Sequence, residues 1–344
     1  QSLIIWRSTS QWIGGLYFLF SIILLIDIFD NNLKKSLTNF LSFNTSEITK
    51  QIFKVFVLYT ALTFIIYLIL KLINFRDFDA FNFALTIISS GGFKPVNEIN
   101  YILNNDLKII VFSLLLLFSF FSIFLTYNLI FLKNKYLNFF TEDFYLLIYL
   151  LSVIFIFLVF FGDNFSIFLF SITSSVSNIG IFFSDFDSSF SFIFLILVII
   201  GGSFFSTSSG IRLFKIYTLF KFSINELISH TKPRQVLISK VIFDEKKVDY
   251  NVINKYFLSI IVFILSLTSL SILLTINGID FSSSIKIGIL TLMNTLNSSI
   301  YGLDNFDFVN INNLTKSIFI IFMIIGRVEF ITLIILFKKY LLKN

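Results

Sequence analysis

The chain has no cysteine and a single histidine, His230. Disulfides, thiolate metal sites and cysteine nucleophiles are therefore excluded, and no cluster of histidines can hold a metal. Only 13% of the residues are charged, about half of the usual share in soluble proteins. Hydrophobic residues make up 56%, and the mean hydropathy is +0.91. This composition excludes a disordered chain and indicates a polytopic membrane protein.

Motifs of common enzyme classes are also missing. The sequence has no P-loop, HExxH or GxSxG pattern, which argues against an ATPase, a zinc protease and a serine hydrolase. A membrane enzyme would need acids, histidine or arginine gathered at one membrane face, whereas the acids here are scattered. We therefore expect no enzymatic activity and no cofactor.

Seven apolar segments are long enough to cross a membrane, since a helix needs about 20 apolar residues to span the hydrocarbon core. Three further apolar stretches are too short to cross. Such lengths suit re-entrant helices, which occur only where protein or a water-filled cavity lines them. The predicted spans are 9–29, 49–74, 107–132, 143–162, 190–221, 253–277 and 315–341, and the short stretches are 78–89, 165–177 and 282–297.

The order long–short–long occurs three times, over 49–132, 143–221 and 253–341, which indicates an internal repeat. Each short stretch ends in a small polar or glycine-containing tip. One such tip would suit an ordinary loop between helices. Tips at the same place in three repeats favour re-entrant pore loops.

The charges fall unevenly on the two predicted sides of the membrane. Connectors that hold the short stretches carry more acids than bases, for example Asp77 and Asp163. The opposite side is rich in bases, for example Lys34 and Lys246. This positive-inside bias places the C-terminus in the cytoplasm. The net charge of +6 is then explained by the orientation of the chain in the membrane, and we expect no nucleic-acid partner.

Seven short motifs stand in order along nearly the whole chain. They are WRS at 6–8 with QWIGG at 11–15, SSGGF at 89–93, SNIG at 177–180, GGSFFSTSSGIR at 201–212, Glu226 with Pro-Arg at 233–234, LNSSIYGL at 296–303, and GRVE at 326–329. In this order they resemble the motifs of the TrkH branch of the Trk/Ktr/HKT superfamily of potassium-uptake proteins. Each motif alone is weak, but the ordered set is specific.

The resemblance implies an all-α polytopic fold with M1–pore helix–M2 repeats around a pseudo-four-fold pore. The first outer helix and first pore loop of the family have no counterpart here, and the chain starts at Gln1, so we expect an N-terminally truncated fragment. The implied parts are 1–30 as the last helix of repeat 1, 49–132 as repeat 2, 143–221 as repeat 3, 222–252 as a basic cytoplasmic linker and 253–341 as repeat 4.

The resemblance also assigns a selectivity filter, in which backbone carbonyl oxygens replace the hydration shell of K⁺. Gly92 and Gly180 match the filter glycines of the family, although glycines at such places can also simply make turns. K⁺ at the filter is the only metal ion expected. The implied filter residues are Ser90, Gly91, Gly92, Asn178, Ile179, Gly180, Ser298, Ser299 and Ile300.

The fourth loop departs from the family pattern. Ile300 stands where the family has its filter glycine, and a β-branched residue with positive φ is a strong outlier. Either this loop is extended, or the register shifts and Gly302 takes the special position. Both alternatives favour monovalent cation transport over strict K⁺ selectivity.

A gate is predicted where the span 190–221 is interrupted at 201–210 by glycines, serines and a threonine. Small residues can also simply pack helices closely. In the family this stretch is an intramembrane loop below the filter, and a matching arginine forms an electrostatic barrier. Arg327 is costly inside an apolar helix and should face a cavity or a partner, with Glu329 a poor candidate because of its spacing. The implied gating residues are Gly202, Ser206, Thr207, Gly210 and Arg327, and Phe204 and Phe205 would make the loop bulkier.

The resulting hypothesis is the pore-forming subunit of a Trk potassium-uptake system in the cell inner membrane. The resemblance implies a cation symport, a homodimer, contact with membrane lipid, and a cytoplasmic nucleotide-binding regulatory ring of the Trk A type. The alternatives are a weakly selective Na⁺/K⁺ transporter, a non-conducting relative, and an enzymatic polytopic membrane protein.

Overall fold

The computed structural model describes residues 1–29, 48–96, 99–123, 137–160, 165–183, 190–231, 240–241, 244–247, 250–296, 300–303, 306, 308 and 310–328. About three-quarters of these residues are helical. The α-helices are α1 (Ser2–Phe29), α3 (Ile48–Leu72), α4 (Asp77–Ile88), α5 (Asp106–Leu116), α7 (Leu137–Phe160), α8 (Phe165–Val176), α9 (Ser191–Ile199), α10 (Leu213–Thr231), α11 (Tyr250–Ile276), α12 (Phe281–Leu292) and α13 (Asn313–Val328). The shorter elements are the 3-10 turns Ile99–Tyr101 and Leu117–Ser119 and the strands β1 (Ile200–Gly201), β2 (Ile211–Arg212), β3 (Lys240–Val241) and β4 (Asp244–Lys247).

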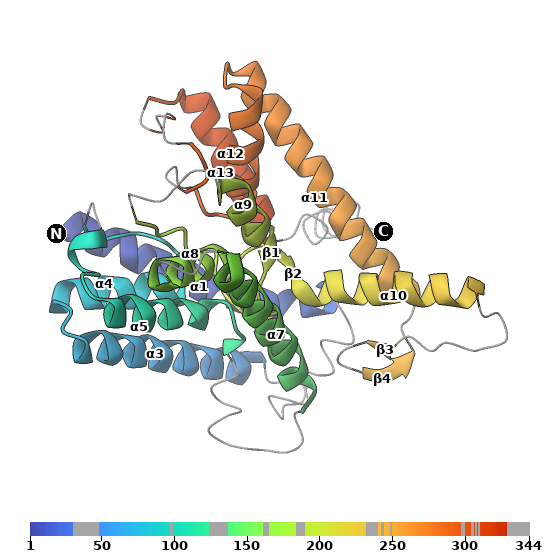
Figure 1. The fold of residues 1–344 in the computed structure, drawn as a ribbon, viewed down its shortest axis with the longest axis horizontal. Coiled ribbons are helices and arrows are strands. Elements are labelled where there is room, and N and C mark those ends of the chain that lie inside the picture. Colours follow the sequence, from blue (N-terminus) through green and yellow to red (C-terminus); the bar gives the residue numbers. More distant parts are fainter. Residues whose placement is uncertain are drawn as a thin grey trace.

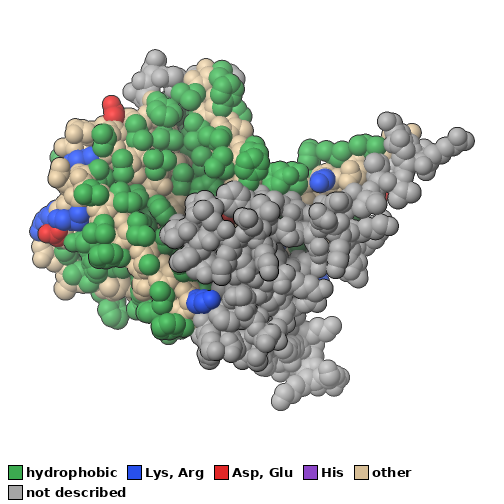
Figure 2. Space-filling view, turned by 90° about the horizontal axis from the view of Figure 1, so that it is seen from below, with side chains coloured by type: hydrophobic (Ala, Val, Ile, Leu, Met, Phe, Trp, Pro, Cys, Tyr) green, Lys and Arg blue, Asp and Glu red, His purple; other side chains and the backbone are tan. Residues whose placement is uncertain are grey.

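Three of the described helices contain segments long and apolar enough to cross a membrane: Ile52–Leu72, Glu142–Val159 and Ile253–Ile276. Large apolar side chains point outward from these helices, among them Phe64 and Leu265. Hydrophobic side chains cover much of the described surface in Figure 2, and charged ones are few. A surface of this kind is stable against lipid and unfavourable in water. The predicted all-α polytopic membrane fold is confirmed.

The three short helices α4, α8 and α12 have 12 residues each, as expected for re-entrant helices. Their last two turns are buried, including polar side chains such as Asn82 and Thr173. Each is packed against a longer helix of its own repeat: α4 against α3, α8 against α7, and α12 against α11. Protein therefore surrounds these short helices, as irregular backbone at membrane depth requires.

The helices form two groups, each around its own hydrophobic cluster (Figure 1). The first group contains α1, α3, α4 and α5, with Tyr59 and Phe112 fully buried. The second contains α9, α11, α12 and α13, with Leu270 and Tyr301 fully buried. Helix α8 packs against α5 and α9 and so joins the two groups. Helix α10 extends away from both groups, beside the start of α11 (Figure 1).

The structure differs from the sequence-based boundaries at three places. Helix α5 ends at Leu116 and continues as a 3-10 turn, so the predicted span 107–132 is not one regular helix over its described part. Helix α12 ends at Leu292 rather than 297, which shifts the fourth loop. Helix α10 continues to Thr231, well into the predicted linker. The first two differences are explained by the contacts of the site.

Candidate functional site

Each short helix ends in the same backbone turn. Ser90, Asn178 and Asn294 follow α4, α8 and α12 with φ values of 48°, 57° and 58°. Serine and asparagine are uncommon at positive φ, and this left-handed residue closes a helix C-terminus. The residue after it then bonds back into the helix in every case: Gly91 N to Thr86 O at 2.8 Å, Ile179 N to Ser174 O at 3.1 Å, and Thr295 N to Leu290 O at 2.9 Å.

The next residue of the turn differs between the repeats. Gly92 and Gly180 both have positive φ, at 76° and 71°, whereas the equivalent residue after α12 is Leu296. The turns touch in sequence order. A Cβ on Gly92 would overlap the Ile179 carbonyl oxygen, and one on Gly180 would lie 3.6 Å from the Thr295 carbonyl oxygen. The three turns therefore share one backbone conformation at their first residue and lie next to each other, with main-chain carbonyl oxygens between them.

The fourth loop has its turn earlier in the chain than Ile300. Because α12 ends at Leu292, its turn is made by residues 294–296, and Ile300 lies further along the chain. Ile300 is fully buried in the hydrophobic cluster of the second helix group. Gly302 has φ of 66°, but its carbonyl accepts a hydrogen bond at 3.1 Å from Nζ of Lys286, in the middle of α12. Ser298 and Ser299 lie outside the described residues.

Polar side chains around the three turns keep atoms without a protein partner. Among the described residues, Gln11 Oε1, both amide atoms of Asn178 and Thr295 Oγ1 are buried with no hydrogen bond. The amide nitrogen of the same side chain, Gln11 Nε2, donates a hydrogen bond to the Gly91 carbonyl at 2.6 Å. Buried polar groups are nearly always satisfied, so a cluster of unsatisfied ones is typical of a site that takes water or an ion.

Below the turns, the chain leaves α9 at β1 and returns at β2 as a closed loop, 202–210, which we call the intramembrane loop. Strands β1 and β2 are parallel, with Ile200 opposite Ile211. Gly210 has φ of 96° and lies so close to Gly201 that neither has space for a side chain. Arg212 fills the loop from inside, since its Nη1 donates to Ser203 O, Ser206 Oγ and Ser208 O at 2.9–3.0 Å.

The intramembrane loop is bonded directly to the end of α4. Thr207 Oγ1 donates to Ile88 O at 2.7 Å, and Ser90 Oγ donates to Thr207 O at 2.9 Å. On another side it is bonded to the turn after α5, because Ser203 N donates to Phe120 O at 2.9 Å and Ser208 N to Ser119 O at 3.1 Å. Those carbonyls are available because α5 stops being a regular helix there.

Phe204 and Phe205 are buried, with 3% and 2% of their surface exposed. The ring of Phe204 packs edge-to-face against Phe214 of α10. The ring of Phe205 lies near Leu19, Val55 and Ile123. The two rings therefore anchor the loop in the hydrophobic cluster of the first helix group. The sequence had suggested added bulk, and the structure shows that this bulk points into the protein core.

Arg327 of α13 reaches the same place. Its guanidinium donates to Ser209 Oγ at 2.8 Å, lies 3.4 Å from Ser90 Oγ and Ser89 O, and covers the Phe18 ring at 4.6 Å. It thus joins the intramembrane loop to the first of the three turns. Glu329 lies outside the described residues.

Two buried acids on α7 were not singled out from the sequence. Glu142 and Asp143 are 2% and 4% exposed. Glu142 accepts hydrogen bonds from Phe204 N at 2.9 Å and Ser203 Oγ at 3.1 Å, while Asp143 accepts one from Ser122 N at 3.0 Å. The available signal was their position, since adjacent acids at the edge of a predicted span are costly unless they have partners.

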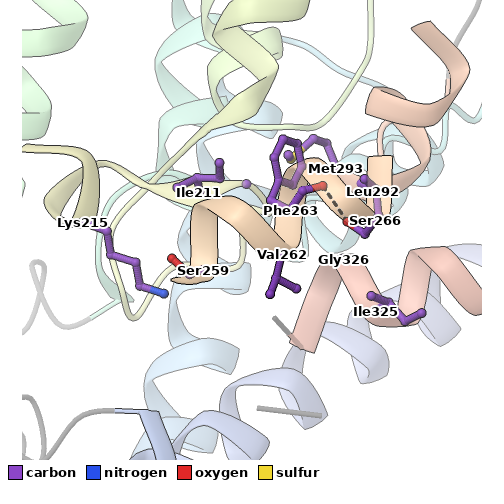
Figure 3. Close-up of a pocket in the computed structure, with 11 residues that line it drawn as sticks. Ile211, Lys215, Ser259, Val262, Phe263, Ser266, Leu292, Met293, Ile325 and Gly326 are labelled. Carbon is purple, nitrogen blue, oxygen red and sulfur yellow. Dashed lines mark hydrogen bonds between the residues drawn. The ribbon is translucent and has the colours of Figure 1, made fainter. Parts of the chain in front are cut away.

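A cavity lies beside the end of the intramembrane loop (Figure 3). It brings together the loop, the C-terminal end of α12 and α13 one residue before Arg327. Gly326 fits closely there, since a Cβ on it would overlap the Leu292 backbone. The lining residues include Gly210, Ile211, Lys215, Val262, Met293 and Gly326.

The fold and the site define a membrane protein of repeated helix–re-entrant helix–helix units, whose re-entrant turns meet above an intramembrane loop. The solved potassium transporter TrkH from Vibrio parahaemolyticus has this fold: the TM-score is 0.79 with 21% sequence identity, over 97% of this chain and 72% of that one. The predicted TrkH-like fold is confirmed.

A sequence relative is similar over the whole chain. It is described as an uncharacterized cation transporter, MJ1485, from Methanocaldococcus jannaschii, and it is 25% identical over 373 residues, covering 100% of this chain and 72% of the relative. No protein-family model matches the chain.

Proposed function

We propose that this protein forms the pore of a potassium-uptake system, in which K⁺ passes through a filter of backbone carbonyl oxygens. The observation that carries the proposal is the contact between consecutive turns, Gly92 against Ile179 and Gly180 against Thr295. Positive φ at the glycines lets successive carbonyls point the same way, as a filter requires. The structural likeness to a potassium transporter and the similarity to a cation transporter support the same class, and neither supports an enzyme.

The donor atoms suit an alkali cation. They are main-chain carbonyl, amide and hydroxyl oxygens, and no group of three or more His, Asp or Glu residues that could hold a metal occurs among the described residues. Oxygens without formal charge compensate for the hydration shell of a monovalent ion without binding it too tightly to leave. A divalent cation would instead call for several carboxylates.

We propose further that the intramembrane loop and Arg327 form the gate. The loop is hydrogen-bonded to the last residue of α4, Ile88, and to Ser90, which begins the first turn. An ion leaving the filter would therefore meet the loop directly. Arg327 adds a positive charge at the same depth, which raises the energy of a cation there. Two kinds of residue would help this segment to move. Its glycines, Gly202 and Gly210, would let it bend, and the hydroxyl groups of Ser206 and Thr207 would keep it solvated.

A weakly selective Na⁺/K⁺ pathway is the second candidate, and Leu296 is the observation that favours it. This residue takes the place of Gly92 and Gly180, and it does not share their positive φ. The fourth loop would then present its oxygens differently, which breaks the symmetry of the coordination shell. Selectivity depends on the number and placement of those oxygens.

The remaining parts of the proposal concern the setting. The charge asymmetry supports an inner-membrane location with a cytoplasmic C-terminus. A homodimer, a nucleotide-binding regulatory ring on the cytoplasmic side and coupling to a second ion are proposed by analogy with Trk systems.

The test is transport. The complete gene should restore growth of a potassium-uptake-deficient bacterium at low K⁺, and the purified protein should carry ⁸⁶Rb⁺ into proteoliposomes. Competition by K⁺ and by Na⁺ separates the two candidates, since a selective filter is blocked by K⁺ at much lower concentration. Absence of both rescue and uptake, with the protein present in the membrane, would contradict the proposal.

A further inference from the structure

Glu142 is a buried acid that the transport function by itself does not require. It lies on α7, outside the three turns and outside the intramembrane loop, yet both of its carboxylate oxygens are bonded to that loop. Oε1 accepts from the main-chain nitrogen of Phe204 at 2.9 Å, and Oε2 accepts from the Ser203 hydroxyl at 3.1 Å. Buried donors that lose their acceptor are costly, so these two contacts hold the loop against α7.

Ser203 connects this acid to Arg212. Its hydroxyl donates to Glu142, while its carbonyl accepts from Arg212 Nη1 at 2.9 Å. The first half of the loop therefore lies between a carboxylate on one side and a guanidinium on the other. Ser203 is thus held through its hydroxyl by α7 and through its carbonyl by Arg212.

The second half of the loop has a different support. Thr207 and Ser209 are bonded to the end of α4 and to Arg327. Glu142 thus holds a different part of the loop from the part that α4 and Arg327 hold.

We propose that Glu142 is a positioning residue that fixes the intramembrane loop against the filter, and that its two hydrogen bonds break when the loop moves aside. This inference rests on the proposed function of the loop as the gate. A residue of this kind sets the balance between the closed and displaced loop without touching the ion. Leaving a buried donor without its acceptor shifts such a balance by about tenfold.

The test uses the absence of cysteine from the chain. A single Thr207→Cys reporter is placed on the loop, where the native side chain is 1% exposed. Its rate of modification by a membrane-impermeant methanethiosulfonate is measured in inside-out vesicles. We expect Glu142→Ala to raise that rate about tenfold, and the isosteric Glu142→Gln, which keeps an acceptor for Phe204 N, to raise it about threefold.

Tyr149→Phe is the matched control. Tyr149 lies on the same helix, and its buried hydroxyl has no hydrogen-bond partner among the described residues, so its removal should leave the rate unchanged. A rate within twofold of the parent in Glu142→Ala, or an equal increase in Tyr149→Phe, would overturn the proposal. If Glu142→Ala does not fold, Glu142→Gln decides, and an unchanged rate there overturns it as well.

A parallel ⁸⁶Rb⁺ flux assay, with Thr207 native, separates this proposal from the transport function. Faster labelling together with faster flux supports both. Faster labelling without flux in any variant, including the parent, supports the role of Glu142 in positioning the loop and contradicts the transport function. Unchanged labelling with normal parental flux contradicts only the role of Glu142.

Discussion

Gly92 and Gly180 offer a matched pair of substitutions, because they occupy the same place in two turns but have different surroundings. Alanine at either position must adopt positive φ, which costs about 1–2 kcal/mol. At Gly180 the new Cβ has space, since the nearest atom is 3.6 Å away. At Gly92 the Cβ overlaps the Ile179 carbonyl oxygen, so the backbone must also shift, at a further cost of about 1–3 kcal/mol.

We therefore expect Gly92→Ala to destabilise the protein by about 2–5 kcal/mol and Gly180→Ala by about 1–2 kcal/mol. Thermal unfolding in detergent measures both, with Gly14→Ala as control because a Cβ there meets no atom within 4 Å. In ⁸⁶Rb⁺ uptake, Gly92→Ala should lose more activity than Gly180→Ala. An equal or larger effect at Gly180 would refute the inferred contact between the turns.

Three further predictions test other parts of the structure. Arg212→Ala should lower stability by about 3 kcal/mol, because three hydrogen bonds to the intramembrane loop are lost, and Arg212→Lys should be intermediate in thermal unfolding. Leu296→Gly should sharpen the preference for K⁺ over Na⁺ in ⁸⁶Rb⁺ competition, whereas Ile300→Gly should leave it unchanged and cost at least about 2–5 kcal/mol of stability. The Ser282 hydroxyl bonded to Asp280 lowers the pKa of that carboxyl below 3.8, so its stabilisation of α12 is present above pH 3.8 and lost as pH falls through the lowered pKa; Asp280→Asn should remove this acid dependence of unfolding.

Much of the architecture follows from patterns that are local in the sequence. Three of the seven predicted spans correspond to described helices that are long and apolar enough to cross a membrane, and the three predicted short stretches correspond to the 12-residue helices α4, α8 and α12. The glycine- and serine-rich stretch 201–210 predicted the break between α9 and α10. Gly92 and Gly180 were predicted as special positions, and their φ values are positive.

The turn after α12 lies earlier in the chain than the motif suggests, for a physical reason. Motif spacing put its special position at Ile300, but the end of α12 is set by packing and by the turn at Asn294, neither of which is visible in the motif. Asparagine tolerates positive φ better than most residues, and that property was the available signal. Ser298 and Ser299 lie outside the described residues, so their assignment to the filter stays a prediction.

The contacts of the intramembrane loop and Arg327 could not be predicted from the sequence, because they join residues far apart in the chain. Glu142 is bonded to Phe204, and Arg327 lies next to Ser90 and Ser209. The sequence showed only that a charge in an apolar segment needs a partner. Which partner it has depends on how the helices pack together.

The central claim is that cations pass through the three turns. Uptake of ⁸⁶Rb⁺ into proteoliposomes that hold the purified protein tests it most directly, with protein-free liposomes as the control. The account predicts uptake that K⁺ competes for more strongly than Na⁺ and that Gly92→Ala abolishes. Uptake no greater than in protein-free liposomes, or uptake unaffected by Gly92→Ala, would contradict it.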